Sequence, residues 1–539
     1  MSRFEYLRLA DAVAAEIANG GLKAGDQLPP QRTFAYERKI AASTASRVYT
    51  ELLRRGLVIG EVGRGTFISG EARRGDTVAL TEPRGARIDF EINYPRLPTQ
   101  AAMIAKSLEG LDRPEALEVA LRQGTSTGTQ TARNITASFL SRNGWSPNSE
   151  QIVFTANGRQ CIAAALAAVV PPGGRCGVEA LTYPFIKGIA ARLGVTLVPL
   201  AMDGDGVRPD AVQKAHREAH LSALYIQPTI QNPLGMTMPP ARRADIVRIA
   251  EKFEFPIIED SVYGFLADET PLAALAPESC VLLDSLSKKV APGLALGFIV
   301  APLRLRESIM ASVRSGGWTA AGYAFAAGQR LMGDGTAAEL VRLKRADAQR
   351  RQQMASERLA GFEIQANRQS YHLWLTLPPH WRSQTFVAAA ARRDIALTPS
   401  TTFAVSPGYA PNAVRLALAQ PPIEQLDLGL RTLAGVLKTQ EEDFDSTEYI
   451  EIAALRKWIH FSHSGQRSVN HAASIAVRSR RSARPDSAFV NIANVGPWVF
   501  YACMEPADVQ FSDVSVRAYG RDRYRKPVRL RASHHLAVL

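Results

Sequence analysis

The stretch Leu282-Leu283-Asp284-Ser285-Leu286-Ser287-Lys288-Lys289 is an apolar, β-like run that ends in hydroxyl groups and two lysines. Pro292 and Gly297 follow and indicate a turn-rich connection. Lysines are rarely fully buried, so a surface loop is one interpretation of this ending. The other is a lysine held against an apolar wall, neutral often enough to condense with an aldehyde, beside hydroxyls that donate to a phosphate.

Two apolar runs upstream also end in polar residues. The run 223–226 is followed by Asn232-Pro233-Leu234-Gly235, and the run 255–258 is followed by Asp260 and Tyr263. The order Asn-Pro-x-Gly, Asp-x-x-Tyr and Ser-x-Ser-Lys resembles fold type I pyridoxal-phosphate enzymes of the class I and II aminotransferase family. Strand and helix patterns that alternate from residue 88 to about 438 agree with an α/β fold and a mostly parallel sheet.

The resemblance implies a site for pyridoxal 5'-phosphate. Lys288 would form the Schiff base, because the Ser-x-Ser-Lys spacing selects it over Lys289. Asp260 would pair with the ring nitrogen and keep it protonated, which makes the ring an electron sink. Arg415 would bind a substrate or effector carboxylate in a two-pronged pair, with a solvent-facing strand arginine as the alternative. The other cofactor-binding residues that the resemblance implies are Gly158, Arg159, Gln160, Tyr183, Asn232, Tyr263, Ser285 and Ser287.

Each of these residues would contact a different part of the cofactor. Tyr183 would stack on the ring, and Asn232 and Tyr263 would bond its phenolic oxygen. The Gly158 turn opens a helical pattern, and free N–H groups at a helix start favour a phosphate. One departure concerns the same phosphate, because Ala295 stands where the family usually has an arginine. We therefore expect weaker cofactor retention. The segment around Gly124 also lacks a tyrosine that is common in the family.

The first seventy residues carry a separate pattern. Periodicity predicts three helices and a small hairpin, at about residues 7–19, 31–36, 43–55, 57–59 and 65–68. This order is typical of a winged helix-turn-helix, in which the third helix enters the major groove, and a plain helical bundle is the alternative. The motifs Gly25-Asp26-x-Leu28-Pro29-x-x-Arg32 and Gly63-x-Gly65-Thr66-Phe67 resemble the GntR-type DNA-binding domain.

The GntR resemblance also implies how the domain contacts double-stranded DNA. The implied DNA contacts are Arg32, Ser43, Thr44, Arg47 and Arg64. Arg32 would anchor a phosphate, and Arg64 would lie in the wing. Where the family usually has Ser-Arg before the helix-three threonine, this chain has Ala41-Ala42. A missing guanidinium costs about 1–3 kcal/mol where it binds a guanine with two bonds, so we expect weaker or differently specified DNA binding.

Composition limits the remaining possibilities. With 539 residues, 46% hydrophobic and 21% charged, the chain is expected to hold two or three globular units. Its longest apolar run, 162–170, is too short for a membrane span, and its first residues lack the apolar core of a signal peptide, so we expect neither. Its four cysteines are scattered, so we expect no metal site and a cytoplasmic location.

The chain is expected to divide into four parts. These are a winged helix-turn-helix at 1–70, a charged linker at 71–87, an aminotransferase-like domain at 88–438 and a basic tail at 439–539. The net charge is +13, and the tail region 446–539 holds fourteen Lys/Arg against seven Asp/Glu. A largely disordered extension is the first interpretation of this tail, and a nucleic-acid-binding arm is the second.

The pairing of these two domains resembles the MocR subfamily of bacterial transcription regulators, over about residues 1–438. The resemblance implies a homodimer on DNA, whose pyridoxal-phosphate domain senses an amino compound or the cofactor itself. An active aminotransferase with a DNA-binding appendage is the alternative, because Asp260, Lys288 and Arg415 would permit a half-reaction. A third hypothesis is a repressor that responds to the cofactor level, in which Arg415 has no ligand.

Overall fold

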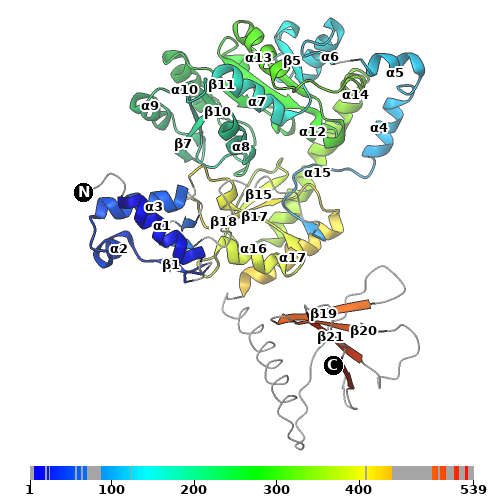
Figure 1. Ribbon diagram of the computed structural model, residues 1–539. Helices are drawn as coiled ribbons and strands as arrows, with labels where there is room; N and C mark the ends of the chain where they lie inside the picture. The colour runs from blue at the N-terminus through cyan, green and yellow to red at the C-terminus, as the bar shows by residue number, and fades with distance from the viewer. Residues whose placement is uncertain are drawn as a thin grey trace, which may run out of the picture. The chain divides into compact units, whose positions relative to one another are not determined.

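The structure is a computed structural model that falls into two units, Met1–Thr447 and Glu448–Leu539 (Figure 1). It describes residues 5–18, 21–23, 25–54, 57–61, 65–68, 86–122, 124–406, 410–439, 488–495, 498–504, 515–520 and 528–531. Most of the predicted linker and much of the predicted tail lie outside these residues. Among the helices that are described, none is long and apolar enough to cross a membrane.

The N-terminal elements form the predicted winged helix-turn-helix. They are α1 (Glu5–Ala18), β1 (Gln27–Leu28), α2 (Gln31–Glu37), α3 (Ala42–Arg54), β2 (Val58–Glu61) and β3 (Gly65–Ile68). The strands pair antiparallel in the order β1-β3-β2, and β1 adds a strand to the predicted hairpin. Phe34 on α2 meets Tyr49 on α3 edge to face at 5.3 Å, and the Tyr49 hydroxyl donates to the Pro29 carbonyl. This apolar core fixes α3, the predicted recognition helix.

Lys39, in the turn between α2 and α3, has a φ of 52°. A side chain in this left-handed conformation costs about 1 kcal/mol, which glycine avoids. We expect Lys39→Gly to raise the melting temperature of the N-terminal domain, measured by differential scanning calorimetry. Lys39→Ala removes the same charge but keeps the strained backbone, so it is the matched control. Equal effects of the two substitutions would contradict this explanation.

The larger domain is built on a seven-stranded sheet in the order β5-β13-β12-β11-β10-β6-β7. Its strands are β5 (Ile152–Thr155), β6 (Arg175–Glu179), β7 (Thr196–Leu200), β10 (Ala223–Ile226), β11 (Ile257–Asp260), β12 (Cys280–Ser285) and β13 (Gly297–Val300). All pairs are parallel except those of β13, which runs opposite to both neighbours. The predicted mostly parallel sheet is confirmed.

Helices cover both faces of this sheet, as Figure 1 shows for α7, α8 and α13 on one side. The α-helices after the N-terminal domain are α4 (Gln100–Leu108), α5 (Pro114–Ala120), α6 (Gln130–Leu140), α7 (Gly158–Val169), α8 (Phe185–Arg192), α9 (Pro209–Glu218), α10 (Pro240–Lys252), α11 (Leu272–Leu275), α12 (Leu286–Lys289), α13 (Leu303–Ser315), α14 (Gly322–Gly333), α15 (Thr336–Arg358), α16 (Ser383–Ala391) and α17 (Ile423–Lys438). On the other face of the sheet, α6, α9, α10 and α14 cover a second apolar core, which contains the strand side chains that point to that face.

A smaller antiparallel sheet follows α15, in the order β14-β15-β18-β17. Its strands are β14 (Ile364–Ala366), β15 (His372–Thr376), β17 (Thr398–Pro399) and β18 (Ala413–Ala417). The short strand pairs β4 (Ile88–Asp89) with β16 (Ile395–Ala396) and β8 (Met202–Asp203) with β9 (Gly206–Val207) complete this unit. Helices α16 and α17 pack with β15 and β18 in one apolar core. This sheet carries Arg415, and β4 begins the segment that leads to the site.

The C-terminal unit contains one described antiparallel sheet, in the order β19-β20-β21-β22. Its strands are β19 (Ala488–Val495), β20 (Trp498–Met504), β21 (Ser515–Gly520) and β22 (Val528–Arg531). These strands were not predicted from the sequence. The remaining residues of the predicted low-structure tail lie outside the described residues, so its character there stays a prediction.

Candidate functional site

A cavity of about 180 Å³ lies where β10, β11 and β12 end and α7 begins. Parallel strands that end side by side leave a crevice at their carboxyl edge, which is where α/β sheets bind ligands. The lining residues are Tyr94, Asn157, Gly158, Arg159, Ile162, Tyr183, Gln227, Asn232, Asp260, Val262, Tyr263, Leu283, Asp284, Ser285, Ser287, Lys288, Pro292 and Ala295. The predicted cofactor-binding residues therefore converge here, Lys288 among them, with the exception of Gln160, which does not line the cavity.

Lys288 reaches this cavity from α12, the short helix that follows β12. Its Nζ donates to the Asn93 carbonyl at 2.6 Å and lies 3.8 Å from the centre of the Tyr94 ring. Burial, followed by the charges of Arg415 and Arg159, lowers the pKa of the Lys288 amine to about 7. A large fraction of this amine is therefore neutral near neutral pH, as nucleophilic attack on an aldehyde requires.

We expect the rate at which cofactor-free protein takes up pyridoxal phosphate to depend on this pKa of about 7. The neutral amine is the nucleophile, so the rate should fall about tenfold per pH unit below the pKa and level off above it. Growth of the visible absorbance after mixing, followed between about pH 5 and pH 9, measures this dependence. A rate that climbs steadily towards the ordinary lysine pKa of 10.5 would contradict the burial effect.

Lys289 has a different environment from its neighbour. Its ammonium group forms a buried ion pair with the Asp284 carboxylate, which also accepts from the Ser285 N–H at 2.7 Å. Lys289 is 4% exposed and Asp284 is 1% exposed. A charge committed to such a pair is a poor nucleophile, which supports the choice of Lys288 between the two lysines.

Asp260 ends β11 and faces the same cavity. Tyr225 donates to its Oδ2 at 2.6 Å, and the Val262 N–H donates to its Oδ1 at 3.2 Å. Burial raises the pKa of the Asp260 carboxyl to about 6, while these hydrogen bonds lower it. A protonated ring nitrogen beside this carboxylate would stabilise its charge, so the residue fits the role that the resemblance implies.

The start of α7 offers a place for a phosphate. Asn157 caps the helix through its side chain, which accepts from the Gln160 N–H at 3.2 Å. A Cβ placed on Gly158 would come within 3.3 Å of the Ser285 hydroxyl, a tight contact that glycine avoids. Helix N–H groups and the hydroxyls of Ser285 and Ser287 suit an anion. The residues present therefore fit pyridoxal phosphate.

Arg159 and Tyr183 lie together at the rim of the cavity. Arg159 Nε donates to the Tyr183 hydroxyl at 3.2 Å, and its guanidinium lies 3.5 Å from the centre of the Phe185 ring. Both residues thus have protein partners already. Ala295 lines the cavity where the family usually has an arginine, so no guanidinium approaches from that position.

Arg415 on β18 is 6% exposed and does not line the cavity. Its Nη2 donates to the Glu91 carbonyl at 2.5 Å and to Thr398 Oγ1 at 3.1 Å, and its Nη1 donates to Asn232 Oδ1 at 3.4 Å. Asn232 lines the cavity, so Arg415 stands directly behind a predicted cofactor residue. Its role in binding a carboxylate stays a prediction.

Several residues at the site were not predicted from the sequence, and among them are four polar side chains that contact it or its predicted residues. These four are Asn93, Tyr94, Tyr225 and Gln227. Tyr225 lies on a strand that the sequence did predict, but nothing in its spacing assigns it to Asp260. Asn93 and Tyr94 are separated from Lys288 by almost two hundred positions, and local patterns carry no signal across such a distance.

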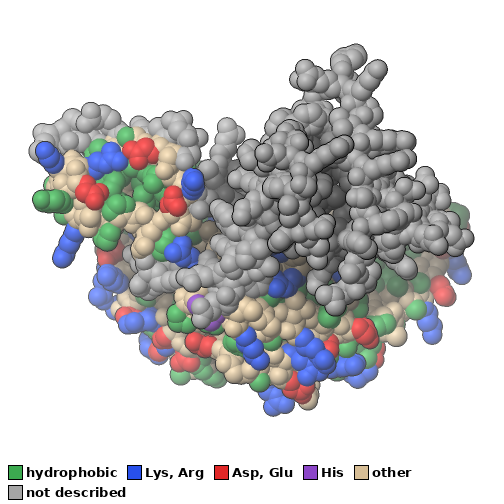
Figure 2. Space-filling view, turned by 90° about the horizontal axis from the view of Figure 1, so that it is seen from below, with side chains coloured by type: hydrophobic (Ala, Val, Ile, Leu, Met, Phe, Trp, Pro, Cys, Tyr) green, Lys and Arg blue, Asp and Glu red, His purple; other side chains and the backbone are tan. Residues whose placement is uncertain are grey.

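The predicted DNA contacts lie on α2 and α3. Arg32, Ser43 and Arg47 are exposed, and Thr44 is half-buried. The prediction for Arg64 lies outside the described residues. On the face drawn in Figure 2, Lys/Arg and Asp/Glu side chains of the described residues are interspersed. The described residues on this face thus form no broad positive surface, and the helix-turn-helix itself is the feature that indicates DNA binding.

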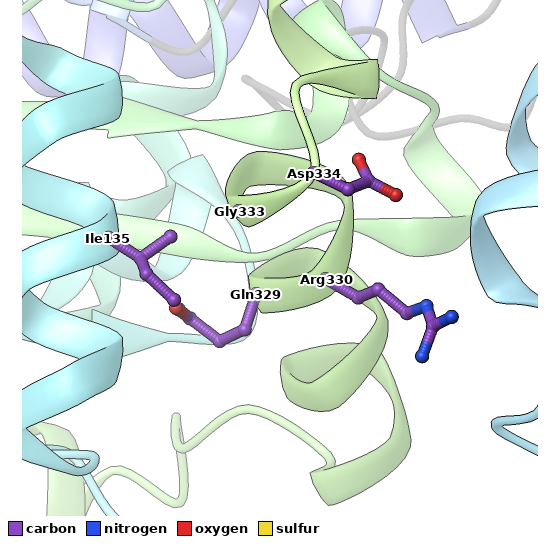
Figure 3. Close-up of a pocket in the computed structure, with 5 residues that line it drawn as sticks. All are labelled: Ile135, Gln329, Arg330, Gly333 and Asp334. Atoms are coloured by element: carbon purple, nitrogen blue, oxygen red, sulfur yellow. The ribbon is translucent and has the colours of Figure 1, made fainter.

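A second hollow lies between α6 and α14, with a volume of about 450 Å³ (Figure 3). Ile135 and Gln329 point towards each other, whereas Arg330 and Asp334 point away from them. Asp334 accepts from the Ser107 hydroxyl at 2.6 Å, and Arg330 donates to the Ser107 carbonyl. These charged groups are occupied in holding α4 to α14, so this hollow is a weaker candidate than the cavity at Lys288.

Two families match the chain in sequence. Residues 88–433 match the family described as "Aminotransferase class I and II". Residues 5–68 match the family described as "Bacterial regulatory proteins, gntR family". The first match includes all of the lining residues of the cavity, and the second includes α1 to β3.

The similar curated proteins include bacterial regulators. The HTH-type transcriptional regulator YdeF of Bacillus subtilis (strain 168) is 28% identical over 442 residues, which are 80% of this chain and 94% of the relative. The HTH-type pyridoxine biosynthesis transcriptional regulator PdxR of Corynebacterium glutamicum is 27% identical over 303 residues, which are 55% of this chain and 65% of the relative.

Solved aminotransferases share the fold of the larger domain. LysN, an α-aminoadipate aminotransferase from Thermus thermophilus, has a TM-score of 0.59 at 22% identity. The alignment covers 66% of this chain and 92% of LysN, which was solved in complex with N-(5'-phosphopyridoxyl)-L-leucine. At this identity the likeness shows the fold.

Proposed function

Because this chain belongs to the MocR subfamily of GntR-type transcription regulators, in which a GntR helix-turn-helix is fused to an aminotransferase class I and II domain, we propose that it senses pyridoxal phosphate or an amino compound at Lys288 and adjusts promoter binding accordingly. In this proposal residues 1–70 bind DNA, and residues 71–87 link this domain to the next one. Residues 88–438 bind the cofactor or the amino compound, and residues 439–539 form a basic tail. The active species is a cytoplasmic homodimer.

One observation carries the proposal: Lys288 and Asp260 face a single cavity at the carboxyl ends of the strands. The amine has a pKa lowered to about 7 and can condense with an aldehyde, while the carboxylate can hold a protonated ring nitrogen. Pyridoxal phosphate supplies the aldehyde, the electron-withdrawing ring and a phosphate for the start of α7. The protein supplies position, charge and exclusion of water.

The departure at Ala295 leads to a prediction about cofactor affinity. Ala295→Arg would place a guanidinium at the cavity wall, where a charge-assisted bond to a phosphate contributes about 1.5–3 kcal/mol. We expect the Kd of pyridoxal phosphate to fall about tenfold to a hundredfold, measured by absorbance titration. Ala295→Gln adds similar length without the charge and is the matched control. An unchanged Kd in Ala295→Arg would show that the chain has compensated for the missing arginine.

An active aminotransferase is the second candidate function. Asp260, Lys288 and Arg415 provide the groups that a half-reaction needs, but Arg415 is bonded to Glu91, Asn232 and Thr398. That arrangement favours sensing of the cofactor itself over rapid turnover of an amino acid. Steady transamination of an amino acid with a common keto acid, abolished in Lys288→Ala, would favour the enzyme instead.

The proposed regulation is tested by DNA binding. A footprint on the DNA upstream of the chain's own coding region identifies the site, and fluorescence anisotropy then gives the Kd with and without pyridoxal phosphate. We expect the Kd to change in the native chain and not in Lys288→Ala. An Arg47→Ala variant controls for the DNA contact, because it should weaken binding in both conditions. No footprint, or no response to cofactor or amino acids, would contradict the proposal.

A further inference from the structure

Residues 91–94, which we call the strap, lie between two firmly held parts of the chain. Before the strap, Ile88 and Asp89 pair with β16, and the Phe90 carbonyl accepts from the Ala417 N–H at 2.8 Å. After it, the chain enters α4. Only residues 88–90 separate the strap from the predicted linker, so it lies close in sequence to the connection with the DNA-binding domain.

Lys288 and Arg415 both donate to backbone carbonyls of this strap. Lys288 Nζ donates to the Asn93 carbonyl at 2.6 Å, and Arg415 Nη2 donates to the Glu91 carbonyl at 2.5 Å. The Asn93 side chain adds a third link, because its Nδ2 donates to the Tyr263 hydroxyl at 2.7 Å. The strap is thus held by residues that are predicted to bind cofactor and effector.

These bonds compete with ligand binding. Condensation of the Lys288 amine with the cofactor aldehyde would form a C=N bond and release water, which would leave at most one N–H on the nitrogen that donates to the Asn93 carbonyl. When an effector amine takes over that C=N bond, Lys288 returns as a free amine. An effector carboxylate would in turn attract the guanidinium of Arg415 away from the Glu91 carbonyl, because charge-assisted bonds to carboxylates are stronger than bonds to neutral carbonyls.

We propose that the strap responds to ligand binding at the site. The hydrogen bond at Asn93 is lost when Lys288 is bound to cofactor, and the one at Glu91 is lost when Arg415 binds a carboxylate. The strap then becomes looser, and this change is transmitted to the linker. The proposal rests on the proposed function of the Lys288 site. It assigns the differential contacts that any ligand-driven change of state requires. Tyr94, whose ring covers Lys288, moves with the strap.

Hydrogen exchange measured by mass spectrometry tests the strap in the full chain. Pyridoxal phosphate should accelerate exchange in peptides covering residues 88–97 on the order of tenfold. Pyridoxine 5'-phosphate has the same ring and phosphate but no aldehyde, so it is the matched control and should leave these peptides unchanged. Exchange in α10, outside the site, is the internal reference. A visible absorbance change without faster exchange at 88–97 overturns the inference, whereas no absorbance change at all contradicts the proposed function instead.

Two variants test the same bonds without any ligand. Lys288→Ala removes the donor to Asn93, and Arg415→Met removes the donor to Glu91, so each should accelerate exchange at 88–97. Lys252→Ala, on the exposed last turn of α10, controls for the loss of a lysine. Unaltered exchange in both folded variants would overturn the inference. If either variant fails to fold, the cofactor comparison in the native chain still decides.

Transmission to DNA is tested by inserting Gly-Ser-Gly between residues 85 and 86. The insertion lengthens the connection but leaves the site intact, so pyridoxal phosphate should still change the absorbance and the strap exchange. The cofactor dependence of the DNA Kd should disappear. If that dependence survives the insertion, or the native chain shows none while binding DNA and cofactor, the strap does not transmit the signal.

Discussion

Replacing Lys288 by alanine is expected to abolish covalent attachment of pyridoxal phosphate. The native protein should show a visible band that borohydride removes, with the cofactor then fixed to the peptide containing residues 282–289. The variant should show neither, because Lys288 is the lysine whose buried amine has its pKa lowered to about 7 in the cavity that also contains Asp260. Absorbance spectra before and after reduction, followed by peptide mass mapping, measure the loss.

The control for this experiment is Lys252→Ala, which changes an exposed lysine. This variant should keep both the visible absorbance band and the cofactor label that borohydride fixes to the peptide. Peptide mapping also separates Lys288 from Lys289. Label on Lys289 in the native protein would show that the Ser-x-Ser-Lys spacing had selected the wrong lysine. A native protein without any band, even with added cofactor, would leave the domain as a dimerising scaffold or a sensor of another compound.

Replacing Lys289 by alanine is expected to lower the free energy of unfolding of the larger domain by about 3–5 kcal/mol. Lys289 and Asp284 form an ion pair with both partners almost completely buried. Lys289 contacts Asp284 Oδ1, and Asp284 Oδ2 has no hydrogen-bond partner among the described residues, so removing the ammonium group leaves a buried carboxylate without its counter-charge. Chemical denaturation followed by tryptophan fluorescence measures the change.

A double variant separates the pair from general damage at this position. Asp284→Asn combined with Lys289→Met removes both charges, so it should recover most of the stability that Lys289→Ala loses. Lys214→Ala breaks an exposed pair with Glu218 on α9 and should change the stability little. Similar losses in the single and double variants would show that packing, and not the unpaired charge, decides the stability here.

The sequence predicted the elements of both domains closely. The helix predicted at 43–55 is α3 (Ala42–Arg54), and the β-like segment at 65–68 is β3 (Gly65–Ile68). Local patterns sufficed there because helix periodicity, caps and turn residues act over a few positions. The same holds for the motif residues at the ends of β11 and β12, since the carboxyl ends of parallel strands must meet at one edge of the sheet.

Other features of the site could not be predicted in this way. The partner of Asp260 is Tyr225, one strand away, and the partners of Arg415 include Glu91, which is 324 positions earlier. Side chains reach such partners only after strands, helices and the segment beside β16 have packed. The burial that shifts the pKa of Lys288 arises in the same step.

The amino-acid sequence by itself thus determined the two domains, the family and the order of the cofactor motifs, because each depends on residues close together in the chain. Only the tertiary structure decided that Lys289 is paired with Asp284, that Arg415 stands behind Asn232, and that Lys288 and Arg415 both hold residues 91–94. The physical reason is that hydrogen bonds and charges between distant segments depend on how those segments pack, and no local pattern encodes that packing.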